Sequence, residues 1–453
     1  MENRSDLLTD IFRAYFDARK NKRNTRSQLI FEMDLEHNLV ELCEQIANRN
    51  YRPSPGICFI TNYPVKREIF ASPFRDRVVH HLLFGYLSPI FERRMIFDSY
   101  SCRKEKGTLQ GIQRLEHHVR SCTQNYTHSA YVLKLDLKGY FMSIDKCRLY
   151  EIICRTIERH CRDEPKIPHK NGVGFDRDLT DYLIRAVLFR NPVEDCKVIG
   201  RPSDWDGLPP SKSLLKSPPG VGLPIGDLTS QLFSNIYLDV LDEFVKRKLG
   251  CRHYGRYVDD FYIVHRSREY LCGLIPVIRD FLREELLLTL HPDKIVLQHY
   301  THGASFLGAY IRPHRRYSTD RTVGLFRNAV SKLETECRKG RPTFERLNEM
   351  LAVINSYCGH LIHFKAYKVL DKQFANSPLK KYFRFTRNYG KAKIKYKYKM
   401  RNDTPTAALQ TIDTMSAFAG NKVDAAAAAR RRRHRGTMMI YPQPQIRRSE
   451  LPS

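Results

Sequence analysis

The sequence predicts an α+β protein, in which an antiparallel sheet carries acidic residues and other stretches of the chain form packed helices. Residues 131–135 and 256–264 are rich in aromatic and β-branched residues, which favour strands. Apolar residues spaced by three and four positions in residues 35–46 and 326–354 predict amphipathic helices. A chain of 453 residues is long enough for two or three domains or subdomains.

The most informative stretch is residues 256–264, RYVDDFYIV. It is expected to form a β-hairpin with Asp259 and Asp260 at the turn. Charged side chains are unfavourable within a strand-forming run, so a pair of acids there needs a reason. Hard divalent cations such as Mg²⁺ prefer carboxylate oxygens, and a hairpin tip holds two of them in fixed relation. The alternative is an ordinary solvated Asp-Asp turn.

A third acid lies near the end of another strand-forming run, residues 131–141, YVLKLDLKGYF. Asp136 could simply be a cap at the strand end. Beside the hairpin in an antiparallel sheet, it would instead complete a cradle of three carboxylates for two metal ions. Two-metal sites activate a hydroxyl group and stabilise a leaving pyrophosphate during in-line phosphoryl transfer.

The charge balance indicates a polyanionic partner. The net charge is +28, from 77 Lys and Arg against 49 Asp and Glu. Because 25 Tyr and 24 Phe are interleaved with the basic residues, nucleic acid is favoured over a membrane surface. No stretch approaches the roughly 18 to 20 apolar residues that span a bilayer, and the first ten residues lack the apolar core of a signal peptide. We therefore expect a cytoplasmic protein.

The cysteine pattern favours thiols over metal ligands. The 12 cysteines include no C-x-x-C pair, and Cys147, Cys154 and Cys161 recur every seven residues in a helical stretch. This spacing suits one helix face better than a tetrahedral zinc site. We expect these three side chains to be reduced and mostly buried.

Three further segments carry weaker signals. Residues 1–50 are expected to be helical and self-contained, with Asp34 capping the helix over 35–46. Lys66 and Arg67 suit a triphosphate, because Arg can bind two oxygens while Lys supplies a point charge, although ordinary surface charge is the alternative. The stretch from about 163 to 220 is rich in Pro and Gly and is expected to be irregular, and either functional or disordered.

The order of these motifs resembles the palm of a reverse transcriptase. A strand ending in Asp136 is followed by Leu223-Pro224-x-Gly226 and then by YVDD at 257–260. Most reverse transcriptases carry glutamine at the position of Ile225. Isoleucine there, with the motif LPPSKS at 208–213, is similar to the reverse transcriptases of diversity-generating retroelements, which lie in the group II intron-like bacterial superfamily. The resemblance covers about residues 30–375.

The resemblance implies a right-hand polymerase with fingers, an antiparallel-sheet palm and a helical thumb. The expected boundaries are listed here: an N-terminal helical segment at 1–50, fingers at 51–130, a palm at 131–315 with the insert at 163–220, a thumb at 316–390, and a basic, flexible C-terminal tail at 391–453.

The resemblance also implies roles for single residues. Asp136, Asp259, Asp260 and the backbone carbonyl of Leu137 would hold two Mg²⁺ ions, with Mn²⁺ as a possible substitute. Lys294 would protonate the leaving pyrophosphate. The residues that would contact the nucleotide are listed here: Lys66, Arg67, Phe141, Ile225, Gly226 and Gln231. Phe141 stands where an aromatic side chain excludes the ribose 2′-hydroxyl group, and its alternative is a core phenylalanine.

The expected activity is RNA-directed DNA polymerisation that makes error-prone cDNA from a retroelement template RNA. Partners implied by the resemblance are the template RNA and primer, the cDNA, dNTPs and a small, basic, oligomeric accessory protein. Ile225 offers only shape where a glutamine amide could form hydrogen bonds, and apolar fit discriminates less strongly than polar contacts. The alternatives are a polymerase of a retron, group II intron or abortive-infection system, and a non-catalytic RNA-binding scaffold.

Overall fold

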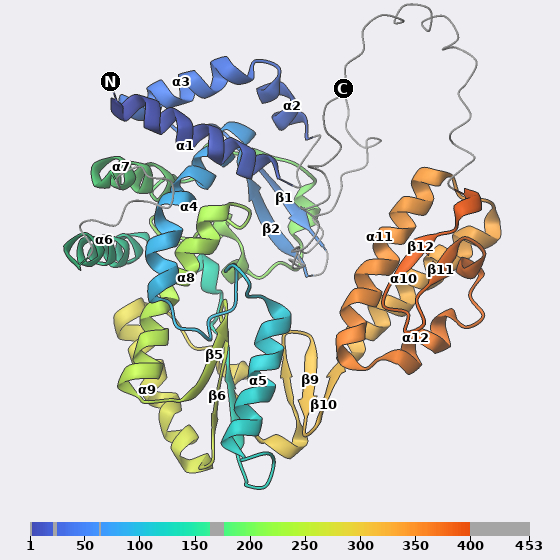
Figure 1. The fold of residues 1–453 in the computed structure, drawn as a ribbon. Helices are drawn as coiled ribbons and strands as arrows, with labels where there is room; N and C mark the ends of the chain where they lie inside the picture. Colours follow the sequence, from blue (N-terminus) through green and yellow to red (C-terminus); the bar gives the residue numbers. More distant parts are fainter. Residues whose placement is uncertain (1, 21–24, 63–64, 164–175, 399–453) are drawn as a thin grey trace, which may run out of the picture. The chain divides into compact units, whose positions relative to one another are not determined.

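The computed structural model describes residues 2–20, 25–62, 65–163 and 176–398 (Figure 1). The chain divides into two compact units, residues 1–298 and 299–453, and each has its own apolar core. The predicted α+β class is confirmed. Within the described ranges, no helix is both long and apolar enough to cross a bilayer. The predicted tail at 391–453 lies outside the described residues from position 399 onward.

A four-stranded sheet lies at the centre of the first unit. Its strand order is β5 (His253–Tyr257), β6 (Asp260–His265), β3 (Tyr131–Leu135) and β7 (Val296–His299). β6 pairs antiparallel with β5 on one side and β3 on the other. Its interior is a continuous buried run, as expected of a strand covered on both faces. The sheet therefore brings the end of β3 and the start of β6, which are distant in the sequence, to the same end of the sheet.

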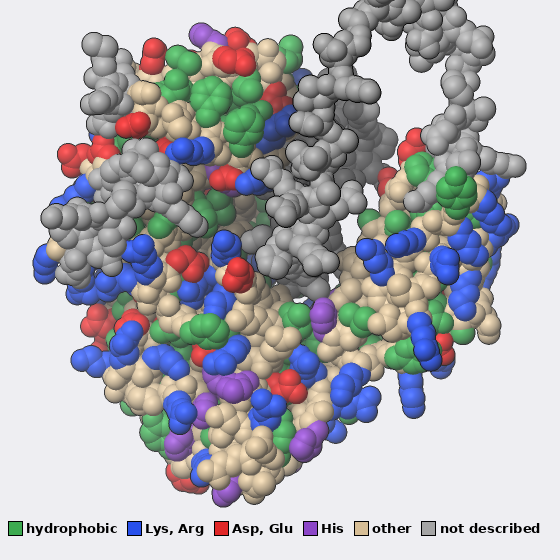
Figure 2. All heavy atoms as spheres, in the orientation of Figure 1, with side chains coloured by type: hydrophobic (Ala, Val, Ile, Leu, Met, Phe, Trp, Pro, Cys, Tyr) green, Lys and Arg blue, Asp and Glu red, His purple; other side chains and the backbone are tan. Residues whose placement is uncertain are grey.

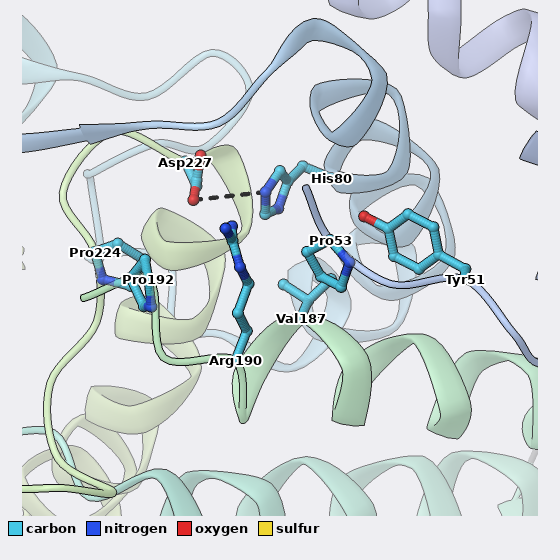
Figure 3. Close-up of a pocket in the computed structure, with 8 residues that line it drawn as sticks. All are labelled: Tyr51, Pro53, His80, Val187, Arg190, Pro192, Pro224 and Asp227. Carbon is cyan, nitrogen blue, oxygen red and sulfur yellow. Dashed lines mark ion pairs between the residues drawn. The ribbon is translucent and has the colours of Figure 1, made fainter. Parts of the chain in front are cut away.

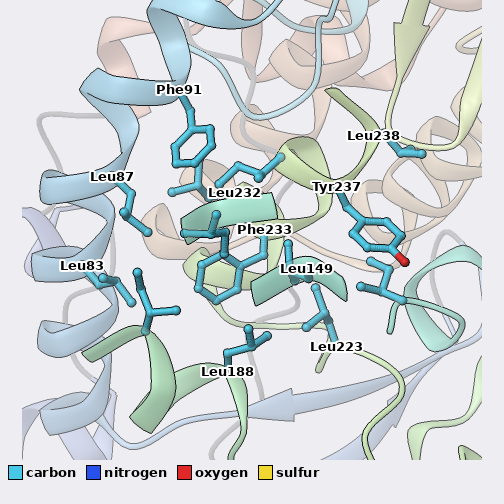
Figure 4. Packing of buried hydrophobic residues seen from close by; sticks show 14 of the residues in the cluster. Leu83, Leu87, Phe91, Leu149, Leu188, Leu223, Leu232, Phe233, Tyr237 and Leu238 are labelled. Carbon is cyan, nitrogen blue, oxygen red and sulfur yellow. The ribbon is translucent and has the colours of Figure 1, made fainter. Parts of the chain in front are cut away.

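Helices α4 (Phe74–Arg94) and α8 (Leu228–Glu243) form much of the core behind the sheet. Leu83, Leu87 and Phe91 of α4 pack with Leu232 and Phe233 of α8 in one apolar cluster (Figure 4). α6 (Lys146–Asp163) also packs against α8. This packing fixes the start of α8, and with it the loop at 220–227 that precedes the helix.

A second sheet joins segments that are far apart in the sequence. β1 (Ile57–Thr61) pairs antiparallel with β2 (Arg67–Ala71) and parallel with β4 (Lys197–Val198). The backbone N–H of Phe70 in β2 donates to the carbonyl oxygen of Ile225, at 2.9 Å. The loop before α8 is therefore attached to the edge of β2.

The N-terminal residues are helical, as predicted, but they are not self-contained. α1 (Glu2–Arg19) packs along α4, α2 (Arg26–Glu32) also contacts α4, and α3 (Leu35–Ala47) packs on α1 (Figure 1). Their apolar residues join the same core as the central sheet, because α4 has an apolar face toward α1. Asp34 occupies the N-cap position of α3, but its side chain makes no capping hydrogen bond.

The predicted insert is more regular than expected, because it contains α7 (Arg177–Leu188), whose face with Leu179, Leu183 and Leu188 is buried in the main core. The remaining described part, from 189 to 220, is irregular, as expected, apart from β4 and three short helical turns.

The expectation that Cys147, Cys154 and Cys161 are mostly buried is wrong. All three are free thiols, but Cys147 is exposed and the other two are only partly buried. The reason is that α6 turns Leu149, Ile153 and Ile157 toward the core instead, and the cysteines lie beside that face.

The second unit begins with the three-stranded sheet β10–β9–β8 and continues into helices. Its elements are β8 (Ala304–Phe306), β9 (Ala309–Arg312), β10 (Arg315–Ser318), α10 (Asp320–Lys339), α11 (Phe344–Leu361), α12 (Tyr367–Phe374), β11 (Phe383–Phe385) and β12 (Ala392–Ile394). The predicted helical stripe is confirmed, since Phe326, Val330 and Leu333 are buried. Lys and Arg outnumber acidic side chains over this unit on the face shown in Figure 2.

Candidate active site

The hairpin that carries two of the candidate acids has a tight two-residue turn. Tyr257 pairs with Asp260, so Val258 and Asp259 form the turn and Asp260 is the first residue of β6. Val258 has a φ of +56°, which is unfavourable for a β-branched residue. The guanidinium of Arg256 donates to the carbonyl oxygen of Val258 at 3.0 Å, and this bond helps to hold the strained turn.

The third acid lies beside this hairpin. Leu135, the last residue of β3, pairs with Phe261, so Asp136 follows directly at the end of β3 next to the start of β6. The backbone carbonyl of Asp136 accepts a hydrogen bond from the N–H of His291 at 2.8 Å. Leu137 is buried, and its backbone forms an isolated antiparallel β-bridge with Leu290. Three acids that are distant in the sequence thus gather at one end of the sheet.

The electrostatics of the three acids show that they interact. Burial and then the negative charge of Asp136 raise the pKa of Asp259 to about 6. Burial also raises the pKa of Asp260 to about 6, opposed by Lys134 and assisted by the other two carboxylates. The positive charges of Lys294 and Arg67 lower the pKa of Asp259. A cation bound at this end of the sheet would therefore relieve the repulsion between the buried carboxylates.

Two lysines contact the acids. Lys294 donates a hydrogen bond from its Nζ to Asp136 Oδ1 at 3.0 Å. Lys134 Nζ lies 3.3 Å from Asp260 Oδ1 and forms an ion pair with it. This oxygen is buried, and the contact with Lys134 does not have the geometry of a hydrogen bond. The structure thus brings Lys294, named from the sequence, to the acidic cluster and adds Lys134.

Magnesium suits this set of residues in the type of its ligands, because the donors are carboxylate oxygens, which hard divalent cations prefer. Their side chains are not gathered into a metal cage: among the described residues, no three or more His, Cys, Asp or Glu side chains form a group that could hold an ion. Asp136 and Asp260 are each turned to a lysine instead. The described side chains therefore do not form the expected cradle of three carboxylates. The strand ends that carry them are neighbours, and the side chains would have to turn to reach a shared ion.

The two residues expected to shape a nucleotide pocket also come together. Phe141 follows β3 in the short helical turn η1 (Tyr140–Met142), and Ile225 lies in the loop before α8. Both are partly buried against the same small apolar cluster. Gly226 has a φ of +146°, and a Cβ there would lie 2.0 Å from the carbonyl oxygen of Phe70. Only glycine allows this close approach of the loop to β2.

The remaining predicted residues lie on the elements around these side chains. Arg67 is the exposed first residue of β2, and its positive charge lowers the pKa of Asp259. Lys66 precedes it, and its Nζ donates to the carbonyl oxygen of Asp206 at 2.7 Å. Gln231 is exposed on the first turn of α8.

A buried ion pair under the hairpin was not foreseen. Arg256 and Asp242 are both 0% exposed, and Arg256 donates two hydrogen bonds to the carboxylate, at 2.6 and 2.7 Å. Tyr254 OH donates to the same carboxylate at 2.6 Å. An arginine inside an aromatic strand run was a usable signal for a buried partner, but the run alone does not say which acid pairs with it.

A small polar pocket fixes the end of the Ile225 loop (Figure 3). His80 of α4 lies 3.5 Å from Asp227, and Ser72 Oγ donates to Asp227 at 2.7 Å. The cavity volume is about 20 Å³, which is room for about one water molecule. Ser72 and Asp227 both face Nε2 of His80, so this is not a catalytic triad, in which the two partners bind different ring nitrogens. The group therefore attaches the loop to α4.

Comparison with known proteins gives one family match and several more distant similarities. Residues 209–311 match the family model described as reverse transcriptase (RNA-dependent DNA polymerase). The match contains Ile225, Gly226, Gln231, Asp259, Asp260 and Lys294, whereas Asp136 and the strand β2 lie outside it. Protein YkfC of Escherichia coli (strain K12) is 22% identical over 338 residues, which cover 67% of this chain and 77% of that protein.

Solved telomerase structures are more distant. Telomerase from Candida tropicalis, truncated from its C-terminal domain, has a TM-score of 0.42 and 13% identity over 59% of this chain and 56% of that chain. Telomerase from Candida albicans, in complex with a fragment of telomeric RNA, has a TM-score of 0.42 and 12% identity over 78% of this chain and 59% of that chain. The chain thus spans somewhat over half the length of these telomerases. The match of residues 209–311 shows that the chain carries a reverse transcriptase domain, the domain of RNA-directed DNA polymerases.

Proposed function

We propose that the chain copies a template RNA into cDNA, with Asp136, Asp259 and Asp260 as its metal-binding acids. The observation that carries this proposal is the pairing of β3 with β6, which sets Asp136 beside the acidic hairpin. The raised pKa values of Asp259 and Asp260, to about 6, support a cation-binding role. Mg²⁺, or Mn²⁺ in its place, would activate the primer 3′-hydroxyl and stabilise the leaving pyrophosphate.

The chain's own residues bind, orient and supply a proton. Arg67 and Lys66 lie at the start of β2 and receive the triphosphate, as a forked and a point cation. Lys294 stands next to Asp136 at 3.0 Å and is positioned to give a proton to the leaving pyrophosphate. The backbone carbonyl of Leu137 is an additional candidate metal ligand. No covalent intermediate with the protein is required, because positioning and charge carry the reaction.

The pocket residues support the more specific proposal of an error-prone enzyme of the diversity-generating retroelement type. Phe141 excludes the ribose 2′-hydroxyl by its bulk. Ile225 contacts the nucleotide by shape alone, where an amide would add directional hydrogen bonds. Gly226 and Gln231 complete the loop and helix start beside it. In such a system, the template RNA, the primer and a small basic oligomeric accessory protein are the partners.

The proposal is tested by primer extension on an RNA template with Mg²⁺. The wild type should extend the primer with dNTPs, and Asp259→Ala should abolish extension while it retains RNA binding. Asp280→Ala is the control, because Asp280 is a half-exposed acid on α9 (Arg268–Leu286) that pairs with Arg283 of the same helix. An RNA-binding scaffold without catalytic activity would bind the template equally well and extend nothing in any of the three proteins.

A further inference from the structure

Glu68 is a buried acid in the middle of β2. It is 1% exposed, and its carboxylate accepts hydrogen bonds from donors in a single distant segment. These donors are Trp205 Nε1 at 2.8 Å, Ser213 Oγ at 2.8 Å, and the backbone N–H groups of Leu214 at 2.6 Å and Leu215 at 3.4 Å. A buried carboxylate is stable only when its oxygens are satisfied in this way. Glu68 therefore attaches residues 199–216, which we term the strap, to β2.

The strap also lies directly against the turn that carries Phe141. Gly139 has a φ of +58°, and a Cβ there would lie 2.5 Å from the carbonyl oxygen of Ser211. Likewise, a Cβ on Gly222 would lie 2.6 Å from a methyl group of Leu214. Side chains larger than hydrogen at these glycines would push the strap away. The close contacts show that the strap packs against both the η1 turn and the Ile225 loop.

An apolar cluster connects the strap to the two pocket residues. Cys58, Phe70, Met142 and Leu214 form its buried centre, and Phe141, Trp205 and Ile225 pack around them. The strap thus supplies one buried side chain, Leu214, and one ring, Trp205, to the support of the proposed nucleotide pocket. In addition, the backbone carbonyl of Asp206 in the strap accepts a hydrogen bond from the Lys66 ammonium group. The strap therefore also contacts a residue that is proposed to bind the triphosphate.

We propose that the strap is a wall of the nucleotide pocket and that Glu68 is the positioning residue that holds it against Phe141 and Ile225. This inference rests on the proposed function, because it assigns selectivity to the same pocket. Glu68 does not touch the reacting atoms. It limits how far Phe141 and Ile225 can move away from the nucleotide, and therefore governs the choice between deoxyribose and ribose rather than the chemical step.

The chain provides a direct probe, because Trp205 is its only tryptophan. The emission of Trp205 reports on the strap during titration with dATP or ATP in the presence of Mg²⁺, without any need for catalysis. Single-nucleotide extension on an RNA template, with dATP and with ATP, then measures KM and kcat for each sugar. Hydrogen exchange of residues 199–216 shows whether the strap remains attached in each variant.

Two variants and one control are needed. Glu68→Gln places an NH₂ group against either the Trp205 N–H or the Leu214 N–H, so at least one strap donor loses its acceptor. Ser213→Ala removes a single donor and leaves β2 intact, which keeps the test valid if Glu68→Gln folds poorly. Glu284→Gln is the matched control, because Glu284 is an exposed acid on α9.

For Glu68→Gln we expect about tenfold weaker dATP binding and an about tenfold higher KM for dATP, with kcat changed by less than about twofold. The preference for dATP over ATP should fall, the exchange of the strap should rise, and Ser213→Ala should show smaller changes in the same direction. A strap that exchanges faster while dATP affinity and sugar preference stay at wild-type values would overturn the proposal. So would a wild type whose Trp205 emission does not respond to dATP. A wild type that binds dATP with a Trp205 response but does not extend a primer would instead contradict the proposed function, while supporting the strap as a nucleotide-pocket wall.

Discussion

Arg256 and Asp242 form an ion pair directly beneath the acidic hairpin, with both side chains fully buried and Arg256 Nη2 lying 2.6 Å from Asp242 Oδ2. The same guanidinium bonds the carbonyl oxygen of Val258 at the strained turn. The pair therefore connects the stability of the first unit with the placement of Asp259. Removal of one member would leave a buried charge without its partner.

We predict that Asp242→Asn lowers the free energy of unfolding by about 3 to 5 kcal/mol. Chemical denaturation monitored by circular dichroism measures this change. Asp280→Asn, which alters a half-exposed pair with Arg283, should change stability by less than about 1 kcal/mol. Equal effects of the two substitutions would show that the buried pair does not stabilise the fold.

A second prediction concerns Asp239, one turn before Asp242 on α8. Burial and then the charge of Asp242 raise its pKa from the usual 3.8 to about 7. The folded state therefore binds this proton more tightly than the unfolded state, and the free energy of unfolding should fall as the pH rises from about 4 to 7. Asp239→Asn removes this loss.

The Asp239→Asn variant should therefore be more stable than the wild type at pH 8, by up to roughly 3 kcal/mol, and close to it at pH 4. Urea denaturation at the two pH values measures the difference. A stability difference between variant and wild type that is the same at both values would contradict the assignment of a raised pKa to this group.

The third prediction tests the sugar preference of the pocket. Phe141 is partly buried against the cluster of Phe70, Met142 and Leu214, and Phe141→Ala removes the bulk of its ring. We expect ribonucleotide incorporation to rise at least about tenfold relative to deoxyribonucleotides, as measured by single-nucleotide extension. Phe97→Ala is the control, since Phe97 is 59% exposed. An unchanged sugar preference would make Phe141 an ordinary core residue.

The fourth prediction concerns accuracy. Ile225 presents its carbonyl oxygen to Phe70, so its backbone is held while its side chain faces the cluster edge. Ile225→Gln adds an amide without moving this backbone bond, and we expect fewer errors opposite template adenine, measured by sequencing the cDNA. Val277→Gln, at a position on α9 that is 43% exposed, should copy adenine as the wild type does. If Ile225→Gln copies adenine with the same error frequency, side-chain shape at this position does not set accuracy.

The sequence predicted those parts of the site that follow from local patterns. The hairpin at 256–264 and the strand before Asp136 are short runs with a clear period, and the register of β3 and β6 joins them. Helices were predicted where apolar stripes were regular, as for Leu39, Leu42 and Ile46.

The rest depends on contacts between distant segments that no local pattern encodes. The partners of Glu68 lie 137 to 147 residues away, and the only sequence trace of them is an acid at an inward position of β2. Residues 1–50 were expected to be self-contained. Their pattern of apolar residues does not show that α4 presents an apolar face to them. The cysteine error arose in the same way, since a seven-residue period defines a helix face but not whether that face is turned inward.

The central claim is that Asp136 acts together with Asp259 and Asp260 as one acidic site. It is tested most directly by primer extension on an RNA template with Mg²⁺, comparing wild type, Asp136→Asn, Asp259→Asn and the control Asp280→Asn at equal RNA occupancy. We predict that Asp136→Asn and Asp259→Asn each lower the extension rate at least about a thousandfold, and that Asp280→Asn extends at the wild-type rate. Extension by Asp136→Asn at the wild-type rate, with Asp259→Asn inactive, would contradict the claim.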